Sequence, residues 1–347
     1  MPDKARKKIT LTEVAERAGV GTATVDRVLN DRGNVSEEIS KRVLQAARDL
    51  GIRRVLPQSH RRLIRIDVIL ARPELPLIAR MGFEFRRLST SLDRSIVIHR
   101  TVLEDEHPET IANALSKTSC DAVVSYMPDH PLVHAALDRL KARGVPVVTV
   151  ISDVPGSARI GYAGTDHYKA GRSAGYFLTR MGRKAGSIII LCNHLGFQSH
   201  SDRVRGITQF LEDSATSWNI AQIVEGLDDR DTSELGLRAA FRQYPEAVAV
   251  YNAGAANIAV AKAIRADLLD VRPVFVGHEL THNTAGFLRE GLMSITIDQS
   301  PELQVRKAVN LILQHFSFGG EQPQLPIESE VPTVLYGPEN IPDPVPF

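Results

Sequence analysis

Five consecutive residues, His278 to His282, match the H-E-x-x-H pattern of zinc-dependent proteases letter for letter. That chemistry needs both histidines on one face of a helix, with the intervening glutamate acting as general base. Here the pattern directly follows the apolar run Arg272–Gly277, which has the composition of a strand. We therefore expect His278 and Glu279 in a strand-to-helix turn. A zinc hydrolase centred on His278 and His282 is the enzyme alternative, and metal analysis of the purified protein would test it.

Other polar residues recur directly after apolar, strand-like runs. In parallel α/β sheets, ligands gather beyond the carboxyl ends of the strands. Carboxylates, amides and an arginine gathered at these strand ends could bind a polyhydroxylated ligand. Each residue alone, however, is more often a helix cap or a loop residue. The sequence shows no glycine-rich phosphate loop, nucleophile elbow or catalytic triad, so we predict no catalytic residue, no cofactor and no metal site. The predicted effector-binding residues are Ser125, Asp153, Asp166, Arg203, Asn252 and Glu279.

The N-terminal region carries a different chemistry. Two short segments with apolar residues at helical spacing meet at a tight turn containing Gly19 and Gly21, a pattern typical of a helix-turn-helix. The second helix of such a motif enters the DNA major groove with its N-terminal residues leading. Arginine is the usual bidentate partner of guanine, and hydroxyl and amide side chains near helix starts hold phosphates. A small helical bundle with a solvated basic face is the competing interpretation. The predicted base contacts are Thr22, Ala23 and Arg27, and the predicted phosphate contacts are Thr10, Thr24, Asn30 and Ser36.

The charges divide unevenly along the chain. Residues 1–62 hold 14 lysines and arginines against 8 acidic residues, whereas the remainder holds 28 against 33. This split indicates a basic head that attracts a polyanion and a mildly acidic body that does not. Thr10 and Glu13 can form a capping box, and Ser36 can cap a third helix that ends at Gly51. The head is therefore expected to be a compact three-helix unit.

Beyond residue 62, apolar runs alternate with amphipathic stretches of helical length. Alternating β and α elements imply right-handed crossovers and parallel sheets covered on both faces. Roughly ten such runs favour two sheets over one. The predicted fold is a small all-α helix-turn-helix headpiece followed by a two-lobed α/β domain with two parallel sheets. The predicted boundaries are 1–51 for the headpiece, 52–62 for a linker and 63–340 for the effector-binding domain, with lobe 1 at 63–161 and 293–325 and lobe 2 at 162–292 and 326–340.

The cysteine content and the hydrophobicity of the chain indicate the cellular compartment in which we expect the protein. Cys120 and Cys192 are the only cysteines, each in a strand-like apolar run, so two buried reduced thiols are expected instead of a disulfide framework. No apolar segment of signal-peptide length follows the basic N-terminus, and no run approaches the roughly 18 apolar residues of a membrane span. We expect a cytoplasmic protein with no membrane partner.

The segment from Ile9 to Gly51 resembles the headpiece of the LacI/GalR-type transcriptional regulators, whose pattern T-hydrophobe-x-D/E-V-A-x-x-A-G-V-S-x-x-T-V-S-R-V-L-N it matches nearly throughout. Later segments, including Ile151–Leu178 and Ser201–Ile207, resemble the family's effector domain, which is similar in fold to periplasmic sugar-binding proteins. The resemblance covers about residues 8–318. It implies the base and phosphate contacts named above. It also implies that Arg203 binds effector hydroxyls, that Asn252 and Glu279 complete the pocket, and that Asp153 and Asp166 lie at other lining positions.

Three features depart from the family pattern. Gly21 and Asp26 stand where serines are usual, and Asp26 is expected to pair with Arg27 or to accept a hydrogen bond from a cytosine amine. The family's hinge helix is not recognisable between Ile52 and Leu63, which argues against operator bending by a leucine wedge. Glu279 stands where aspartate is usual, which leaves the identity of the ligand open.

Together these patterns predict a sequence-specific DNA-binding transcriptional regulator, acting as a repressor and controlled by a small sugar-like effector bound between two lobes. A homodimer is expected, because one headpiece contacts too few bases and two-fold symmetry matches a pseudo-palindromic operator in double-stranded DNA. The protein is not expected to be an enzyme. The alternative from another class is a cytoplasmic solute-binding or sensor protein without operator specificity, which the basic, motif-bearing head opposes.

Overall fold

The computed structural model describes residues 10–30, 35–50, 63–214, 217–266, 268–318 and 330–345. The chain divides into two compact units, Met1–Leu63 and Ile64–Phe347. The linker predicted at residues 52–62 lies outside the described residues.

The N-terminal unit is the predicted three-helix structure. Thr10 and Glu13 form the expected capping box, in which the Glu13 amide donates to Thr10 Oγ1 at 3.3 Å. Gly19 ends the first helix with φ at 65°, a left-handed conformation that glycine adopts without strain. Arg42 of the third helix donates to the Ala18 carbonyl at 2.6 Å and so joins the third helix to the end of the first. The helices are α1 (Leu11–Ala18), α2 (Thr22–Leu29) and α3 (Glu37–Asp49), and their core is Val14, Ala15, Ala18, Val25, Val28, Leu29, Val43, Leu44, Ala46 and Ala47.

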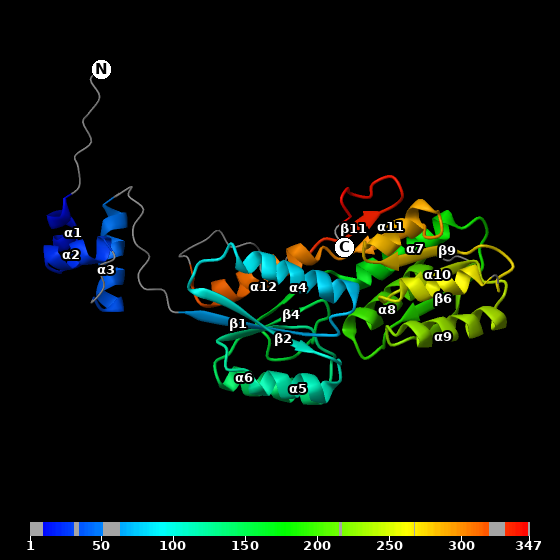
Figure 1. The fold of residues 1–347 in the computed structure, drawn as a ribbon, viewed down its shortest axis with the longest axis horizontal. Coiled ribbons are helices and arrows are strands. Elements are labelled where there is room, and N and C mark those ends of the chain that lie inside the picture. Colours follow the sequence, from blue (N-terminus) through cyan, green and yellow to red (C-terminus); the bar gives the residue numbers. More distant parts are fainter. Residues whose placement is uncertain are drawn as a thin grey trace, which may run out of the picture. The chain divides into compact units, whose positions relative to one another are not determined.

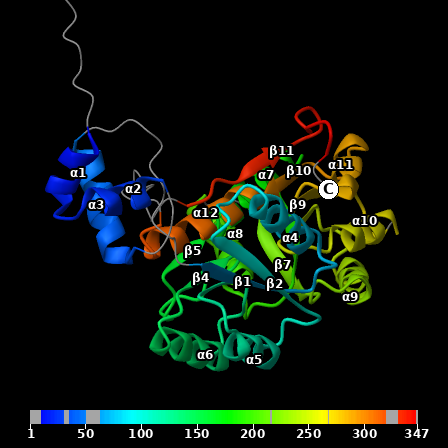
Figure 2. The same ribbon diagram turned by 60° about the vertical axis from the view of Figure 1, so that its left-hand side comes forward.

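The first lobe of the larger unit is built on a five-stranded sheet in the order β2-β1-β3-β4-β5, with every pair parallel. Two helices cover each face of this sheet (Figures 1 and 2). The strands are β1 (Ile64–Ala71), β2 (Ile96–Leu103), β3 (Ala122–Ser125), β4 (Val147–Val150) and β5 (Gly161–Ala163). The helices are α4 (Pro76–Ser89) and α12 (Pro301–His315) on one face, and α5 (Pro108–Lys117) and α6 (Pro131–Ala142) on the other.

Alternation along β1 explains why both faces are covered. Ile66 and Val68 pack into the cluster that contains α4 and α12, whereas Ile69 packs into the cluster that contains α5 and α6. A strand buried on both faces needs apolar side chains in both directions, which is the pattern of a parallel sheet. β2 forms the edge of the sheet and leaves Val97 and Val102 exposed.

The second lobe repeats the plan on a six-stranded sheet in the order β11-β10-β9-β8-β6-β7, parallel except that β11 runs antiparallel to β10. The strands are β6 (Ser187–Cys192), β7 (Asn219–Glu225), β8 (Ala249–Asn252), β9 (Val274–His278), β10 (Ile295–Asp298) and β11 (Val334–Tyr336). The helices are α7 (His167–Met181) and α8 (Gln198–Asp213) on one face, and α9 (Arg230–Gln243), α10 (Asn257–Arg265) and α11 (His282–Arg289) on the other. Within the described ranges, no helix has the length and apolar character needed to cross a membrane.

The boundary between the lobes differs from the sequence expectation at two crossings. We expected lobe 1 to resume at residue 293. Instead, β10 pairs with β9 in the second sheet, and only α12 packs against the first lobe. The chain therefore crosses back after Asp298, because the apolar residues of β10 are needed to extend the second sheet. The same kind of shift places β5, through Ala163, in the first sheet.

Candidate functional site

A cavity lies between the two lobes, where the carboxyl ends of the strands of both sheets meet. Its walls come from the start of α4, from the loops after β3, β4, β7, β8 and β10, from the end of β9 and from the first turns of α8. This is the position at which open α/β sheets bind ligands. Its volume is only about 40 Å³, room for a few water molecules at roughly 10–15 Å³ each. The lining residues are Leu75, Leu77, Ile78, Tyr126, Ile151, Ser199, His200, Arg203, Asp228, Gly254, Ala255, His278, Glu279 and Gln299.

Arg203 is a buried cation whose guanidinium is only partly hydrogen-bonded by the described residues. Its Nε donates to His167 Nδ1 at 3.2 Å, and its Nη1 donates to the Ala253 carbonyl at 2.6 Å. Its Nη2 is buried and has no hydrogen-bond partner among the described residues. The side chain is only 3% exposed, so the guanidinium is largely removed from bulk solvent. A ligand oxygen placed in the cavity would satisfy the remaining N–H groups.

Three further polar atoms of the cavity wall are buried without a partner in the described part of the chain. They are His200 Nδ1, His278 Nδ1 and Gln299 Oε1. Burial, with the nearby charge of Arg203, lowers the pKa of His200 to about 3 and the pKa of His278 well below its usual value. Both rings are therefore neutral at pH 7, and each can donate or accept through the open nitrogen. Buried unsatisfied groups are rare in folded proteins, so their concentration here indicates a polar ligand.

Glu279 joins the cavity to an ion network that spans the lobes. It adopts φ of 68° directly after β9, and its Oε1 accepts from Gln299 Nε2 at 2.5 Å. Its Oε2 accepts from Arg80 Nη1 at 3.3 Å, and Arg80 Nη1 also donates to Asp298 at 2.5 Å. Burial and the charge of Asp298 raise the pKa of Glu279 to about 7. Because Arg80 lies on α4 of the first lobe, this network ties the first lobe to the second.

A second polar bridge crosses between the lobes near Arg72, in the loop after β1. Arg72 donates to the carbonyls of Leu227 and Asp228 at 2.6 and 3.2 Å and lies 3.5 Å from Glu106. Glu106 also accepts from Asn193 of the second lobe at 2.9 Å. Asp228 lines the cavity, and burial raises its pKa to about 6. The two bridges hold the lobes together around the small cavity.

Two of the six predicted effector residues, Arg203 and Glu279, line the cavity. The other four do not line it, because each is engaged in the turn that contains it. Ser125 Oγ donates to the Tyr126 carbonyl, Asp153 pairs with Arg159, Asp166 caps α7, and Asn252 donates to Asn257. Asn252 Oδ1 also accepts from the amide of Gly254, so it shapes a part of the wall without facing the cavity.

Arg80, Asp228 and Gln299 were missed by the sequence reasoning. Arg80 had a signal, since it is a charged residue at a buried position of the amphipathic helix α4. A charge at such a position requires a partner. Asp228 and Gln299 follow β7 and β10, two strands whose residues form only a weak strand pattern.

The histidines of the H-E-x-x-H pattern do not share a helical face. His278 is the last residue of β9, is 1% exposed, and its Nε2 lies 2.8 Å from the Tyr251 hydroxyl. His282 is the first residue of α11 and is exposed. Glu279 is held by Arg80 and Gln299. The pattern is therefore divided between a strand, a turn and a helix, as its flanking residues predicted, and lacks the geometry of a zinc protease.

The headpiece presents its second helix as a candidate nucleic-acid interface. Val25, Val28 and Leu29 of α2 are buried in the helical core, while Thr22, Ala23 and Arg27 are exposed on the other side. Gly21 caps α2 without a side-chain hydrogen bond, which leaves backbone amides at the helix start available to an anion. The three predicted base contacts therefore share one accessible face.

The predicted phosphate contacts lie at helix ends, and three of them make local hydrogen bonds. Thr10 caps α1, and Ser36 Oγ accepts the Ile39 amide at 3.4 Å at the start of α3. Asn30 Nδ2 donates to Asp26 Oδ1 at 2.7 Å, a partner for Asp26 that we had not anticipated. Thr24 is partly exposed on α2.

Two family profiles match separate parts of the chain. Residues 10–54 match the bacterial regulatory proteins of the lacI family, and residues 105–321 match the periplasmic binding protein domain. The ribose operon repressor of Halalkalibacterium halodurans is 28% identical over 155 residues, which is 40% of this chain and 45% of that protein. The HTH-type transcriptional regulator AscG of Escherichia coli is 54% identical over 44 residues, which is 13% of either protein. The chain thus aligns with less than half the length of these curated relatives.

Solved structures share the fold of the larger unit at low sequence identity. A solute-binding protein of Burkholderia graminis in complex with D-arabinose has a TM-score of 0.72 at 18% identity, covering 81% of this chain and 98% of that chain. GanP, a glucose-galactose binding protein from Geobacillus stearothermophilus, has a TM-score of 0.70 at 19% identity, with 80% and 99% covered. A solute-binding protein of Agrobacterium vitis bound with α-D-tagatopyranose has a TM-score of 0.71 at 16% identity, with 81% and 97% covered. At these identities, the comparison shows only that the two-lobed fold is shared.

Proposed function

The chain belongs to the periplasmic binding protein domain family and carries a headpiece of the lacI family, and on that premise we propose that it is a DNA-binding transcriptional regulator controlled by a sugar-like effector. The most direct support is a set of four buried polar atoms in the cavity between the lobes that have no hydrogen-bond partner in the described part of the chain, which also carries a helix-turn-helix. The buried polar atoms favour a polar ligand, and the helix-turn-helix favours DNA. A solute-binding protein without operator specificity does not require a helix-turn-helix.

On the DNA side, α2 enters the major groove with its N-terminal end leading. Arg27 donates two hydrogen bonds to guanine O6 and N7, and Thr22 and Ala23 contact neighbouring base edges. Thr10, Thr24, Asn30 and Ser36 contact phosphates and set the register of the helix. The exposure of the first three residues and the open amides at the start of α2 support this arrangement.

The regulator acts as a homodimer on a pseudo-palindromic operator and functions as a repressor. One headpiece presents a single short recognition helix, which contacts too few bases for useful specificity. A two-fold dimer doubles the number of base contacts and matches the symmetry of the site. The protein acts in the cytoplasm, where its operator lies, and catalyses no reaction.

On the effector side, Arg203 and Glu279 contact the ligand directly. A polyhydroxylated molecule both donates and accepts, as the open atoms of Arg203, His200, His278 and Gln299 require. Ser125, Asp153, Asp166 and Asn252 act behind the cavity wall by fixing the turns that form it. The ion pair of Asp153 with Arg159 and the bond from Gly254 to Asn252 support such positioning roles.

Effector binding requires the lobes to move. A cavity of about 40 Å³ does not hold a monosaccharide, so the ligand enters a more open arrangement. If the effector favours one separation of the lobes, it changes the placement of the two headpieces in the dimer and hence operator affinity. Coupling of this kind needs about 1–3 kcal/mol of differential affinity.

A thermal-shift screen with neutral sugars, polyols and sugar acids tests the effector half of this proposal. A ligand that binds the folded state stabilises it in proportion to occupancy, so one chemical class should raise Tm in a concentration-dependent manner. The Arg203→Ala variant should lose that response. If no class raises Tm at concentrations that saturate ordinary sugar-binding proteins, the sugar-like effector is excluded.

A further inference from the structure

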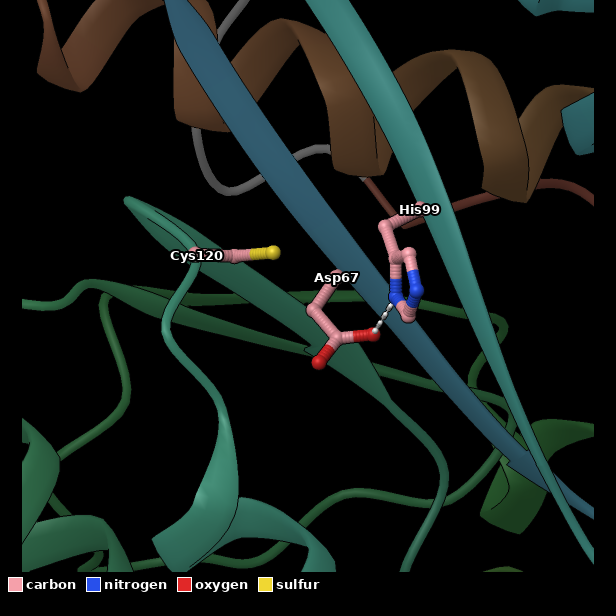
Figure 3. Close-up of side chains that lie close together, drawn as sticks. All are labelled: Asp67, His99 and Cys120. Carbon is pink, nitrogen blue, oxygen red and sulfur yellow. Dashed lines mark hydrogen bonds and ion pairs between the residues drawn. The ribbon is translucent and has the colours of Figure 1, made fainter.

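Three side chains of different ligand chemistry converge on the first lobe, away from the effector cavity. Asp67 on β1 and His99 on β2 are direct register partners of adjacent parallel strands. Cys120, in the loop before β3, directs its sulfur toward them (Figure 3). One ligand atom of each residue lies within 4.8 Å of the others, and among the described residues these three form the one group of this kind. Cys120, which we expected to be buried, is partly exposed.

Asp67 is a buried carboxylate without a strong counter-charge. It is 4% exposed, accepts from Thr101 at 2.8 Å and Thr118 at 2.7 Å, and lies 3.2 Å from His99 Nδ1. Within the described ranges, no lysine or arginine forms an ion pair with Asp67. Two threonine hydroxyls satisfy hydrogen bonds but do not neutralise a charge, and a buried carboxylate without a cation is unfavourable. A cation at this position would remove that penalty.

The three ligand atoms suit one class of metal ion. A carboxylate oxygen, an imidazole nitrogen and a thiolate sulfur together are typical of zinc and similar divalent ions, whereas calcium and magnesium prefer oxygen alone. Zinc bond lengths of about 2.0–2.3 Å place tetrahedral ligand atoms about 3.5 Å apart. The separations here are within a side-chain adjustment of that value. The His99 side chain is 63% exposed, so it is not held in place by packing.

The surroundings allow an ion to reach these residues. The cluster borders a recess of about 490 Å³ on the surface, which shares no lining residue with the effector cavity. Burial and the charge of Asp67 raise the pKa of the Cys120 thiol when no metal is present. A bound divalent ion reverses this effect, because it stabilises the thiolate directly.

We propose that Asp67, His99 and Cys120 form a binding site for a zinc-class divalent cation, with water from the recess in the fourth position. This site is separate from the proposed effector cavity and does not depend on the proposed function. The bound ion ties the edge strand β2 to β1 and to the loop before β3, with one ligand from each.

The test is a cobalt titration of the full chain with any affinity tag removed, in the presence of a thiol-free reductant. Cobalt reports thiolate ligation through a sulfur-to-metal charge-transfer absorption band, and zinc competition then gives the zinc affinity. Cys192 supplies the matched control, because it is the chain's only other cysteine and is buried in the second lobe. His99→Gln and Cys120→Ser alter residues with exposed or partly exposed side chains and leave the threonine bonds to Asp67 in place. Circular dichroism checks that each variant is folded.

The wild type and Cys192→Ala should bind one equivalent and show the charge-transfer band. Cys120→Ser should lose the band, and His99→Gln should bind zinc at least about tenfold more weakly, since loss of even an outer-shell partner weakens binding by that factor or more. A band that persists in Cys120→Ser would place the metal elsewhere and overturn the site. Zinc affinity unchanged in His99→Gln, or no stoichiometric binding by the wild type, would overturn it equally.

Discussion

The polar side chains of the recognition helix and those of the cavity between the lobes differ in their exposure to solvent. On α2, Thr22, Ala23 and Arg27 are exposed, so water satisfies them until a partner replaces it. In the cavity, Arg203 and its neighbours are buried, so each polar atom must find a partner in the protein or in a ligand. We therefore expect the exposed face of α2 to bind DNA without a rearrangement of its side-chain packing. The buried groups of the cavity already carry the cost of desolvation, so we expect the cavity to select ligands that match its polar atoms.

The same contrast extends to how each region is held together. The headpiece core is assembled from three consecutive helices within some forty residues, and its ion pairs, such as Arg17 with Asp49, lie at the surface. The cavity is held by buried ions from distant parts of the chain, above all Arg80, Glu279 and Asp298. Substitutions in this buried ion network should therefore affect folding as well as binding, whereas those at the exposed positions of α2 should affect binding alone.

The largest expected effect is on stability. Arg80→Met should lower the free energy of unfolding by about 3–5 kcal/mol, because it leaves the buried carboxyl groups of Glu279 and Asp298 without a cation. Urea denaturation measures the change. The control is Arg265→Met, which removes an exposed ion pair with Glu290 and should change stability by less than about 1 kcal/mol. Equal effects of the two substitutions would contradict the importance of the interlobe network.

The next effect concerns ligand affinity. Arg203→Ala should weaken effector binding by about 1.5–3 kcal/mol or more, the range for hydrogen bonds to a charged group, while leaving operator affinity without effector unchanged. Isothermal titration with the effector class found in the thermal screen measures the loss. Arg205→Ala, on the same helix but exposed, is the matched control and should retain full affinity. An unaltered affinity in Arg203→Ala would remove this residue from the binding site.

On the headpiece, Arg27→Ala should weaken binding to the specific operator by about 1–3 kcal/mol, since the bidentate contact to one guanine is lost. Binding to random DNA should hardly change, and folding should be unaffected because the side chain is exposed. Fluorescence anisotropy with operator and shuffled duplexes separates the two. An equal loss on both DNAs would mean that Arg27 contacts only phosphate.

The last expected effect is a pH dependence of stability. The pKa of Glu279 is raised to about 7 in the folded state by burial and by Asp298, so the folded protein binds more protons there than the unfolded chain. This group's contribution is therefore fully present at acidic pH and is lost as pH rises through about 7, with a slope of at most about 1.4 kcal/mol per pH unit.

The buried histidines act in the opposite direction. The lowered pKa values of His167, His200 and His278 reduce stability as pH falls below the ordinary value for histidine. The difference between wild type and Glu279→Gln isolates the glutamate, because the histidines are common to both. That difference should change between pH 5 and 8. A difference independent of pH would argue that Glu279 is ionised throughout.

The contrast also explains what could be predicted from sequence. The helix-turn-helix is encoded in contiguous residues, so caps, turns and the exposed face of α2 followed from local spacing. The place of Glu279 at the cavity followed from its position after a strand-like run, and that of Arg203 from its position near the start of the helix after Cys192. Arg80 did not, because nothing local shows that its charge meets Glu279, 199 residues further along the chain. The crossing at residue 293 was misplaced for a similar reason, since only the pairing of β10 with β9 assigns those residues to the second sheet.

The central claim is that one chain joins a sequence-reading helix to an effector cavity, and selection of bound fragments from sheared genomic DNA tests it most directly. The experiment is run with and without the effector class found in the thermal screen. We predict that a two-fold symmetric sequence is enriched over shuffled competitor and that the effector changes its retention, while the Arg203→Ala variant retains the enrichment and loses the effector response. Absence of any preferred sequence under both conditions would contradict the account.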